Sequence, residues 1–144
     1  MRGPYSNDRL ELVRVFVFTS AVFPSVLLVF LGSGLGGALR YGITVLMPRH
    51  DASTFPYATL AVNLIGCLLI GFGATLLAGR EPWRLLLLVG VLGGFTTFSS
   101  YARETLDLWQ AGQIAAAMAY VLISNLAGLA LALAGHAMAR QIVS

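Results

Sequence analysis

Charge is scarce in this chain of 144 residues: only 10% of them are charged, and lysine is absent altogether. A soluble globular domain carries about 25% charged residues. The shortfall excludes a cytosolic enzyme of ordinary composition and a disordered tail. A net charge of +3 on so apolar a chain does not indicate a phosphate-binding surface, so we expect no nucleic-acid partner. The single cysteine, Cys67, permits no intramolecular disulfide and no thiolate metal cluster.

Apolar sequence, in contrast, is abundant: 58% of the residues are hydrophobic and the mean hydropathy is +0.82. Four runs contain no Asp, Glu, Lys or Arg, namely Val15–Leu39, Ala52–Gly79, Leu85–Ala102 and Leu108–Ala139. A helix needs roughly 20 apolar residues to cross the hydrocarbon core of a bilayer. The sequence therefore predicts an all-α integral membrane protein with four transmembrane helices and loops too short for a separate domain.

The N-terminal segment differs from the rest because Met1–Arg14 is polar. No small-residue cleavage site is followed by a polar mature start, and the apolar run continues toward Arg40, so we expect no cleaved signal peptide. We interpret residues 1–23 as a polar or amphipathic lead-in and residues 24–144 as the four-helix transmembrane domain. Pro24 would then stand in the first turn of the first span, where proline is tolerated.

The arginines give only a weak signal for orientation. Four spans place one group of arginines on the side of both termini and another on the opposite side: Arg2, Arg9, Arg14, Arg80, Arg84 and Arg140 against Arg40, Arg49 and Arg103. Arginine-rich loops favour the cytoplasmic side, but without the N-terminal tail the two groups are equal. Such a chain can insert both ways round, which permits an antiparallel, dual-topology homodimer. A monomer oriented by its tail is the alternative.

Two polar side chains stand inside apolar runs. Arg40 follows the glycine-rich run Gly32–Gly37, in which small residues four apart let helices approach closely. It either snorkels to the interface, pairs structurally or marks a pathway. Asn63 lies in the middle of the second span, one helical turn after Thr59. Its amide either clasps another helix or donates to an anion.

The third span contains Gly93-Gly94-Phe95-Thr96-Thr97, in which two glycines and two β-branched threonines disfavour a helix over about one turn. A helix broken inside a membrane is tolerated only where its unpaired backbone groups are buried in protein or line a cavity. Broken helices of this kind hold ions, although a kink for packing is the alternative. Neutral polar side chains would continue the path as a track: Thr59, Asn63, Ser100, Tyr120 and Ser124.

Three motifs occur in order along the chain: glycines leading to Arg40-Tyr41, T-L-x-V-N-x-x-G at Thr59–Gly66, and GGFTTFSSY at Gly93–Tyr101. Together they resemble the CrcB/Fluc family of fluoride channels, over about Gly32–Ala139. The resemblance implies a passive, fluoride-selective channel that exports fluoride across the inner (plasma) membrane. It also implies that the partners are fluoride, membrane lipid and a second copy of the chain. The expected assembly is an antiparallel dual-topology homodimer with two pores and a central structural sodium ion.

By position, the resemblance also implies which residues line the pore. The two pore aromatics fall at Phe98 and at Tyr101, where relatives usually have phenylalanine, so the second ring gains a hydroxyl. The backbone carbonyls of Gly93 and Thr96 match the sodium ligands. The other pore residues implied are Asn63, Thr59, Ser100, Tyr120, Ser124, Glu104 and, at the pore vestibule, Arg40.

Elementary chemistry agrees with a pore of neutral donors. Fluoride is strongly hydrated, so a pore must replace its water with good donors, yet a fixed cation at mid-pore would hold the ion too tightly for exit. Aromatic ring edges are electropositive and can face an anion.

The sequence leaves rival functions open. A four-helix drug/proton antiporter needs a membrane-embedded carboxylate, whereas we expect Glu104 and Asp107 to lie toward a loop. A non-transporting assembly subunit is a second rival. An enzyme is not expected, because His50 and His136 are far apart and the sequence shows no His/Asp/Glu cluster.

Overall fold

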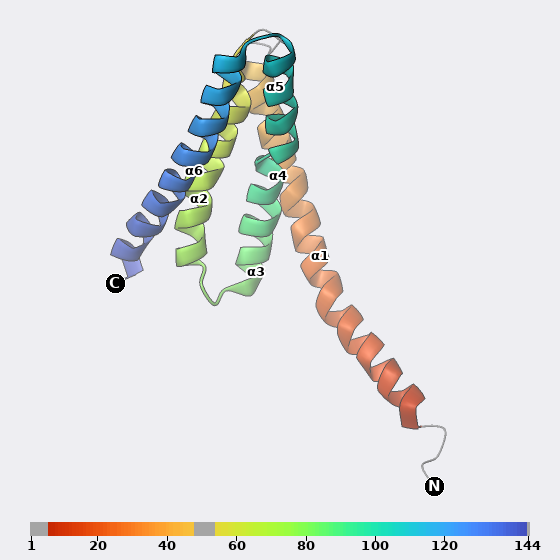
Figure 1. Cartoon of the computed structure of the whole chain (residues 1–144). Helices are drawn as coiled ribbons and strands as arrows, with labels where there is room; N and C mark the ends of the chain where they lie inside the picture. The colour runs from red at the N-terminus through yellow and green to blue at the C-terminus, as the bar shows by residue number, and fades with distance from the viewer. Residues whose placement is uncertain (1–5, 48–53, 144) are drawn as a thin grey trace.

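The structure is a computed structural model that describes residues 6–47 and 54–143. Within these residues all regular structure is helical (Figure 1). Four helical stretches are long and apolar enough to cross a membrane: Val22–Leu46, Tyr57–Leu76, Glu81–Gln110 and Ile114–Val143. Three belong to single helices, α1 (Ser6–Leu46), α2 (Tyr57–Leu76) and α6 (Ile114–Val143). The prediction of an all-helical chain with four spans is confirmed.

The third span is interrupted, as the sequence predicts. It consists of α3 (Glu81–Trp83), the π-helical segment η1 (Arg84–Leu92), α4 (Gly93–Phe95) and α5 (Phe98–Gln110). The break lies at Thr96 and Thr97, whose backbones are extended, with ψ 156° and φ −147° respectively. Gly93 and Gly94 remain helical, so the interruption is confined to the two β-branched residues, which disfavour a helix.

Helix α1 extends through most of the segment that the sequence assigns to a lead-in. It runs without interruption from Ser6 to Leu46, so Pro24 lies inside the helix and not in its first turn. The apolar span within α1 begins at Val22, close to the expected boundary. The division of the chain into a lead-in at residues 1–23 and a membrane domain stays a prediction.

The spans pack as two pairs that diverge toward one end of the molecule (Figure 1). α2 packs along α6, and α1 packs along η1 and α4. Glycines make the second contact close: a Cβ at Gly32 or Gly36 would overlap the backbone carbonyl oxygens of Leu86 and Val91. The small-residue face expected in the first span is therefore used within the chain, to seat α1 on the third span.

The helices alternate in direction, as four spans require. Figure 1 shows the start of α1, the connection between α2 and α3, and the end of α6 toward the same end of the molecule. This end carries Arg80, Arg84 and Arg140, and α5 with Arg103 lies toward the other. Arg2 and Arg49 fall outside the described residues.

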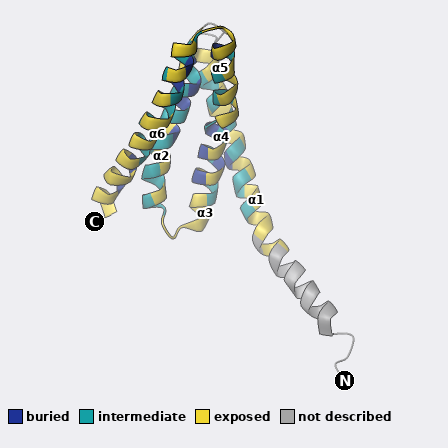
Figure 2. Cartoon of the chain, in the orientation of Figure 1, coloured by how far each residue is buried: buried dark blue, intermediate teal, exposed yellow. Residues whose placement is uncertain are grey.

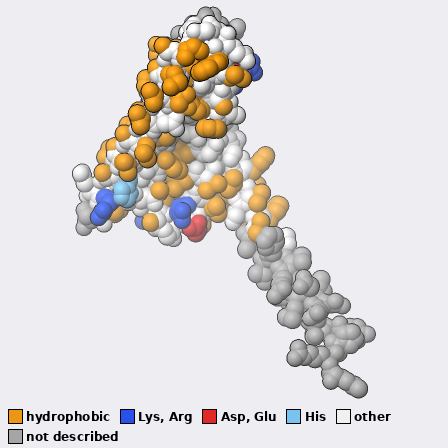
Figure 3. Space-filling view, in the orientation of Figure 1, with side chains coloured by type: hydrophobic (Ala, Val, Ile, Leu, Met, Phe, Trp, Pro, Cys, Tyr) orange, Lys and Arg blue, Asp and Glu red, His pale blue; other side chains and the backbone are white. Residues whose placement is uncertain are grey.

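Little of this chain is buried on its own (Figure 2). The core cluster is small, formed by Leu108, Ala117 and Tyr120. Large apolar side chains are exposed on every span, and in Figure 3 hydrophobic side chains cover the face in view while the visible charged ones lie toward its ends. Exposure of this kind suits a surface that meets acyl chains or another protein chain.

Candidate functional site

A groove of about 360 Å³ lies where the broken third span faces α2 and α6. None of the described residues that line it carries a charge. Its polar lining comes from both sides of the helix break and from the two neighbouring spans. The lining residues are Asn63, Gly66, Cys67, Ile70, Leu88, Leu92, Gly93, Thr96, Thr97, Phe98, Tyr101, Ser124 and Asn125.

Asn63 holds the helix break. Its Nδ2 donates to the Thr97 carbonyl oxygen at 3.1 Å, and the Thr97 N–H donates to Asn63 Oδ1 at 2.8 Å. The side-chain amide thus replaces the backbone partners that Thr97 loses when the helix stops. Of the two roles open for Asn63, the clasp is present; a second Nδ2 hydrogen is still available to an anion.

The threonine pair also starts the next helix. Thr97 is the N-cap of α5, where its Oγ1 accepts from the Ser100 N–H at 3.2 Å and donates to Ser100 Oγ at 3.0 Å. This is the usual way in which a threonine satisfies the free N–H groups of a first helical turn. The cap fixes α5, which carries Phe98 and Tyr101, against the groove.

The aromatic rings of the site form a continuous series. Phe98 and Tyr101 have ring centroids 5.4 Å apart, Tyr101 and Tyr120 5.2 Å, and Tyr120 and Phe55 5.5 Å. The last two contacts are edge-to-face. Phe98, at the open end of the series, is 78% exposed, so its ring has room to meet a second chain or an ion.

Glu104 gathers two of the predicted track residues. Thr59 Oγ1 donates to Glu104 Oε1 at 2.6 Å, and the Tyr120 hydroxyl donates to Oε2 at 2.8 Å. The sequence predicts Glu104 toward a loop, but α5 continues to Gln110 and the carboxylate lies between α2 and α6. The hydroxyl hydrogens of Thr59 and Tyr120 are committed to this carboxylate and are not aimed at the groove.

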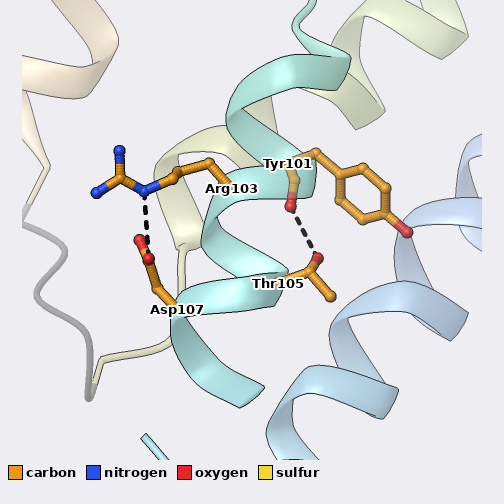
Figure 4. Close-up of polar contacts among 4 residues, drawn as sticks. All are labelled: Tyr101, Arg103, Thr105 and Asp107. Atoms are coloured by element: carbon orange, nitrogen blue, oxygen red, sulfur yellow. Dashed lines mark hydrogen bonds and ion pairs between the residues drawn. The ribbon is translucent and has the colours of Figure 1, made fainter. Parts of the chain in front are cut away.

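On another face of α5, Arg103 Nε donates to Asp107 Oδ1 at 3.2 Å (Figure 4). Arg40 has a different partner. Its Nε donates to the Gly94 carbonyl oxygen at 3.2 Å, which joins α1 to the last turn before the break. The guanidinium therefore pairs structurally, and Arg40 is outside the groove lining.

Ser124 Oγ is buried and is the sole side-chain polar atom among the described residues with this burial and no hydrogen-bond partner. It lines the groove from α6. A buried hydroxyl without a partner costs free energy, which a bound water or ion recovers.

The site predicted from the sequence does not include Cys67, Thr97 or Asn125, although all three line the groove. Thr97 could have been found from the cap pattern that a threonine makes before a helix. Nothing in the sequence signals the placement of Asn125 against Tyr101.

The predicted sodium ligands, Gly93 and Thr96, both line the groove. In an unbroken helix the Thr97 N–H would donate to the Gly93 carbonyl, but it donates to Asn63 instead. The Gly93 carbonyl is thereby relieved of its helical donor, and Gly93 is exposed. Hard cations prefer oxygen ligands, so this freed Gly93 carbonyl oxygen has the chemistry of a sodium ligand. The described residues contain no cluster of His, Cys, Asp or Glu that could hold a metal.

Four apolar spans, one of them broken beside an uncharged polar groove, place the chain among polytopic membrane proteins with a discontinuous helix, an arrangement that many ion-handling proteins share. Comparison with known proteins identifies the family. Residues 27–136 match the family described as CrcB-like protein, Camphor Resistance (CrcB). The chain belongs to this family and is a multi-pass membrane protein.

Curated relatives agree with this assignment and bear the name "Fluoride-specific ion channel FluC". The chain is 48% identical to the one from Paracoccus denitrificans over 79% of its length and 93% of the relative's. It is 45% identical to a Coxiella burnetii protein, covering 82% of this chain and 99% of that one. A Phocaeicola vulgatus relative is 41% identical over 73% of this chain and 89% of its own length.

Proposed function

We propose that this protein is a passive, fluoride-selective channel that exports fluoride and so lowers its cytoplasmic concentration. The names of its relatives support fluoride as the ion. The observation that carries the proposal is the uncharged groove beside the helix break, lined by amide, hydroxyl and aromatic groups.

The groove chemistry suits an anion that must be bound and released. Asn63 retains a free amide hydrogen, Ser124 has a buried hydroxyl without a partner, and the Phe98 ring is exposed. Neutral donors and ring edges replace part of the water around fluoride without the deep trap that a fixed cation would make. Arg40, held on the Gly94 carbonyl outside the groove, would attract anions without binding them at mid-pore.

The channel is proposed to be an antiparallel, dual-topology homodimer with two pores. One chain buries little of its apolar surface and leaves Phe98 exposed at the groove, so a second chain would complete the wall. The balanced arginines of the loops favour neither orientation strongly. A pair of inverted copies would complete one groove on each chain.

A sodium ion at the centre of the dimer is part of this proposal. The Gly93 and Thr96 carbonyls would hold it, with matching carbonyls from the second chain. A bound sodium ion would supply positive charge beside the carbonyl oxygens that the helix break leaves without N–H donors. We expect the channel in the inner (plasma) membrane, because this membrane bounds the cytoplasm from which fluoride would be exported. The relatives are named as channels, which supports a function that is not enzymatic.

An antiporter is the rival with a structural argument, because Glu104 lies within the third span. Both oxygens of this carboxylate accept hydrogen bonds, from Thr59 and Tyr120, and Glu104 is outside the groove lining. A carboxylate that exchanges protons for a cargo needs access to that cargo. The arrangement therefore favours the channel.

Efflux from liposomes tests the proposal. Purified protein reconstituted in liposomes loaded with potassium fluoride should release fluoride passively, without a proton gradient, and far faster than it releases chloride. Phe98→Ile removes the ring edge from the groove and should lower fluoride efflux at least tenfold. Phe30→Ile is the matched control, because Phe30 is similarly exposed, at 72%, but lies on α1 outside the groove.

Two results would contradict the proposal. Proton-coupled cation uptake without fluoride efflux would establish an antiporter, and no ion flux at all would leave an assembly subunit. Crosslinking in native membranes tests the dimer separately. If every crosslinked product joined parallel chains, the antiparallel arrangement would be excluded.

A further inference from the structure

The Tyr101 hydroxyl lies at the groove, where its oxygen accepts a hydrogen bond from a neighbouring side chain. Asn125 Nδ2 on α6 donates to the Tyr101 hydroxyl oxygen at 3.2 Å. In Figure 4 the Tyr101 ring extends from α5 toward α6, away from Arg103 and Asp107. Both Tyr101 and Asn125 line the groove.

The hydrogen bonds of Asn125 leave the Tyr101 hydroxyl able to act as a donor. The Asn125 amide has two N–H hydrogens. One goes to the Val121 carbonyl oxygen at 2.8 Å and the other to Tyr101. Because the tyrosine oxygen is used as an acceptor here, its own hydrogen is available to a different acceptor.

The ring is also held in place. Its centroid lies 5.4 Å from that of Phe98 on one side and 5.2 Å from that of Tyr120 on the other. Contacts of this kind fix the ring plane, and the Asn125 amide fixes the oxygen. The hydroxyl is thus oriented before an ion arrives, which reduces the entropy lost on binding.

The surroundings offer this hydrogen no carboxylate partner. The Glu104 oxygens already accept from Thr59 and Tyr120. The Tyr101 hydrogen is therefore placed for a solute in the groove, where Ser124 Oγ also stands without a partner.

We propose that the Tyr101 hydroxyl is a further anion-binding donor of this groove, and that Asn125 is the residue that positions it. This inference rests on the proposed function and deepens it, because it names a residue pair that sets the affinity for fluoride. A hydrogen bond to a charged group changes a dissociation constant by a factor of about ten or more.

The test measures initial fluoride efflux or current against fluoride concentration, in liposomes, for the wild type and four variants. Tyr101→Phe keeps the ring and removes the hydroxyl, so the half-saturating fluoride concentration should rise about tenfold while the maximal rate does not fall. Asn125→Leu should also raise the half-saturating fluoride concentration. Tyr57→Phe is the matched control, because it removes a phenol hydroxyl from a ring outside the groove lining.

The double variant Tyr101→Phe/Asn125→Leu separates positioning from a general structural effect. If Asn125 acts through the Tyr101 hydroxyl, its substitution adds nothing once that hydroxyl is gone. Each variant is first checked for the elution volume of the wild type, so that a misfolded protein is not scored.

Three outcomes decide the matter. A shifted half-saturation with non-additive variants supports the inference. A conducting wild type with an unchanged half-saturation in Tyr101→Phe, or additive effects in the double variant, overturns the inference and leaves the proposed function intact. A wild type that passes no fluoride overturns the proposed function itself.

Discussion

Asn63→Leu removes the clasp on the helix break while keeping the heavy-atom branching of the side chain. The leucine cannot donate to the Thr97 carbonyl or accept from the Thr97 N–H, bonds that measure 3.1 Å and 2.8 Å in the wild type. Both Thr97 groups lie where the helix cannot supply replacements, because the backbone at Thr96 and Thr97 is extended. The substitution therefore leaves one donor and one acceptor without partners inside a membrane span.

The expected loss of stability follows from this count. An unpaired buried polar group costs about 1–3 kcal/mol, so two groups cost about 2–6 kcal/mol. Asn63 and Thr97 are half-buried, and water in the groove can reach part of the break. The lower end of the range applies, and we expect the free energy of unfolding to fall by about 2–3 kcal/mol.

The assay is denaturant unfolding of the purified protein in detergent, followed by fluoride efflux from the variant in liposomes. Thr105→Val is the matched control, since it removes a hydrogen bond of 2.8 Å from Thr105 Oγ1 to the Tyr101 carbonyl (Figure 4). That carbonyl keeps its helical N–H donor, so the control should lose less than about 1 kcal/mol. Efflux should fall at least tenfold for Asn63→Leu.

The stability of the two variants can refute the role of Asn63 at the helix break. If Asn63→Leu and Thr105→Val lose the same stability, Asn63 does not hold the break. A variant that loses stability but conducts fluoride normally would restrict Asn63 to the clasp and remove it from the ion pathway.

Two further predictions concern packing and access. Gly36→Ala should sharply lower the yield of folded protein, because its Cβ would overlap the Val91 carbonyl. Gly37→Ala should not, since nothing lies within 4 Å of the Cβ added there. Size-exclusion profiles compare the two variants, and equal profiles would contradict the packing of α1 on the third span. A small thiol reagent should slow efflux by modifying Cys67 in the groove, and Cys67→Ser should abolish the block; a block that persists in Cys67→Ser would place the reagent elsewhere.

Much of the fold follows from local sequence. The four uncharged runs predict the spans because a bilayer offers backbone groups no partner, so each apolar run must become a helix. The β-branched side chains of Thr96 and Thr97 indicate the break, and Gly32 and Gly36 predict a close helix contact. The start of α1 at Ser6 was not predicted, since a helix can continue through an interior proline when one missing hydrogen bond is tolerated.

The site depends more on contacts between distant segments. The sequence predicts one polar track that includes Asn63, Thr59, Tyr120 and Glu104. In the structure the hydrogen bonds of these residues divide between two places: Asn63 bonds to Thr97 at the break, and Thr59 and Tyr120 donate to Glu104. Such a division depends on rotation of each helix about its axis, which apolar periodicity leaves open when a helix is apolar all round.

The sequence by itself determined that this chain enters a membrane, how many times it can cross, and where one crossing breaks. Only the tertiary structure decided which polar groups are already paired and which remain available to an ion. The reason is physical: apolarity and β-branching act within a few neighbouring residues, whereas a hydrogen bond between spans needs two side chains, such as Asn125 and Tyr101, to be brought within about 3 Å of each other.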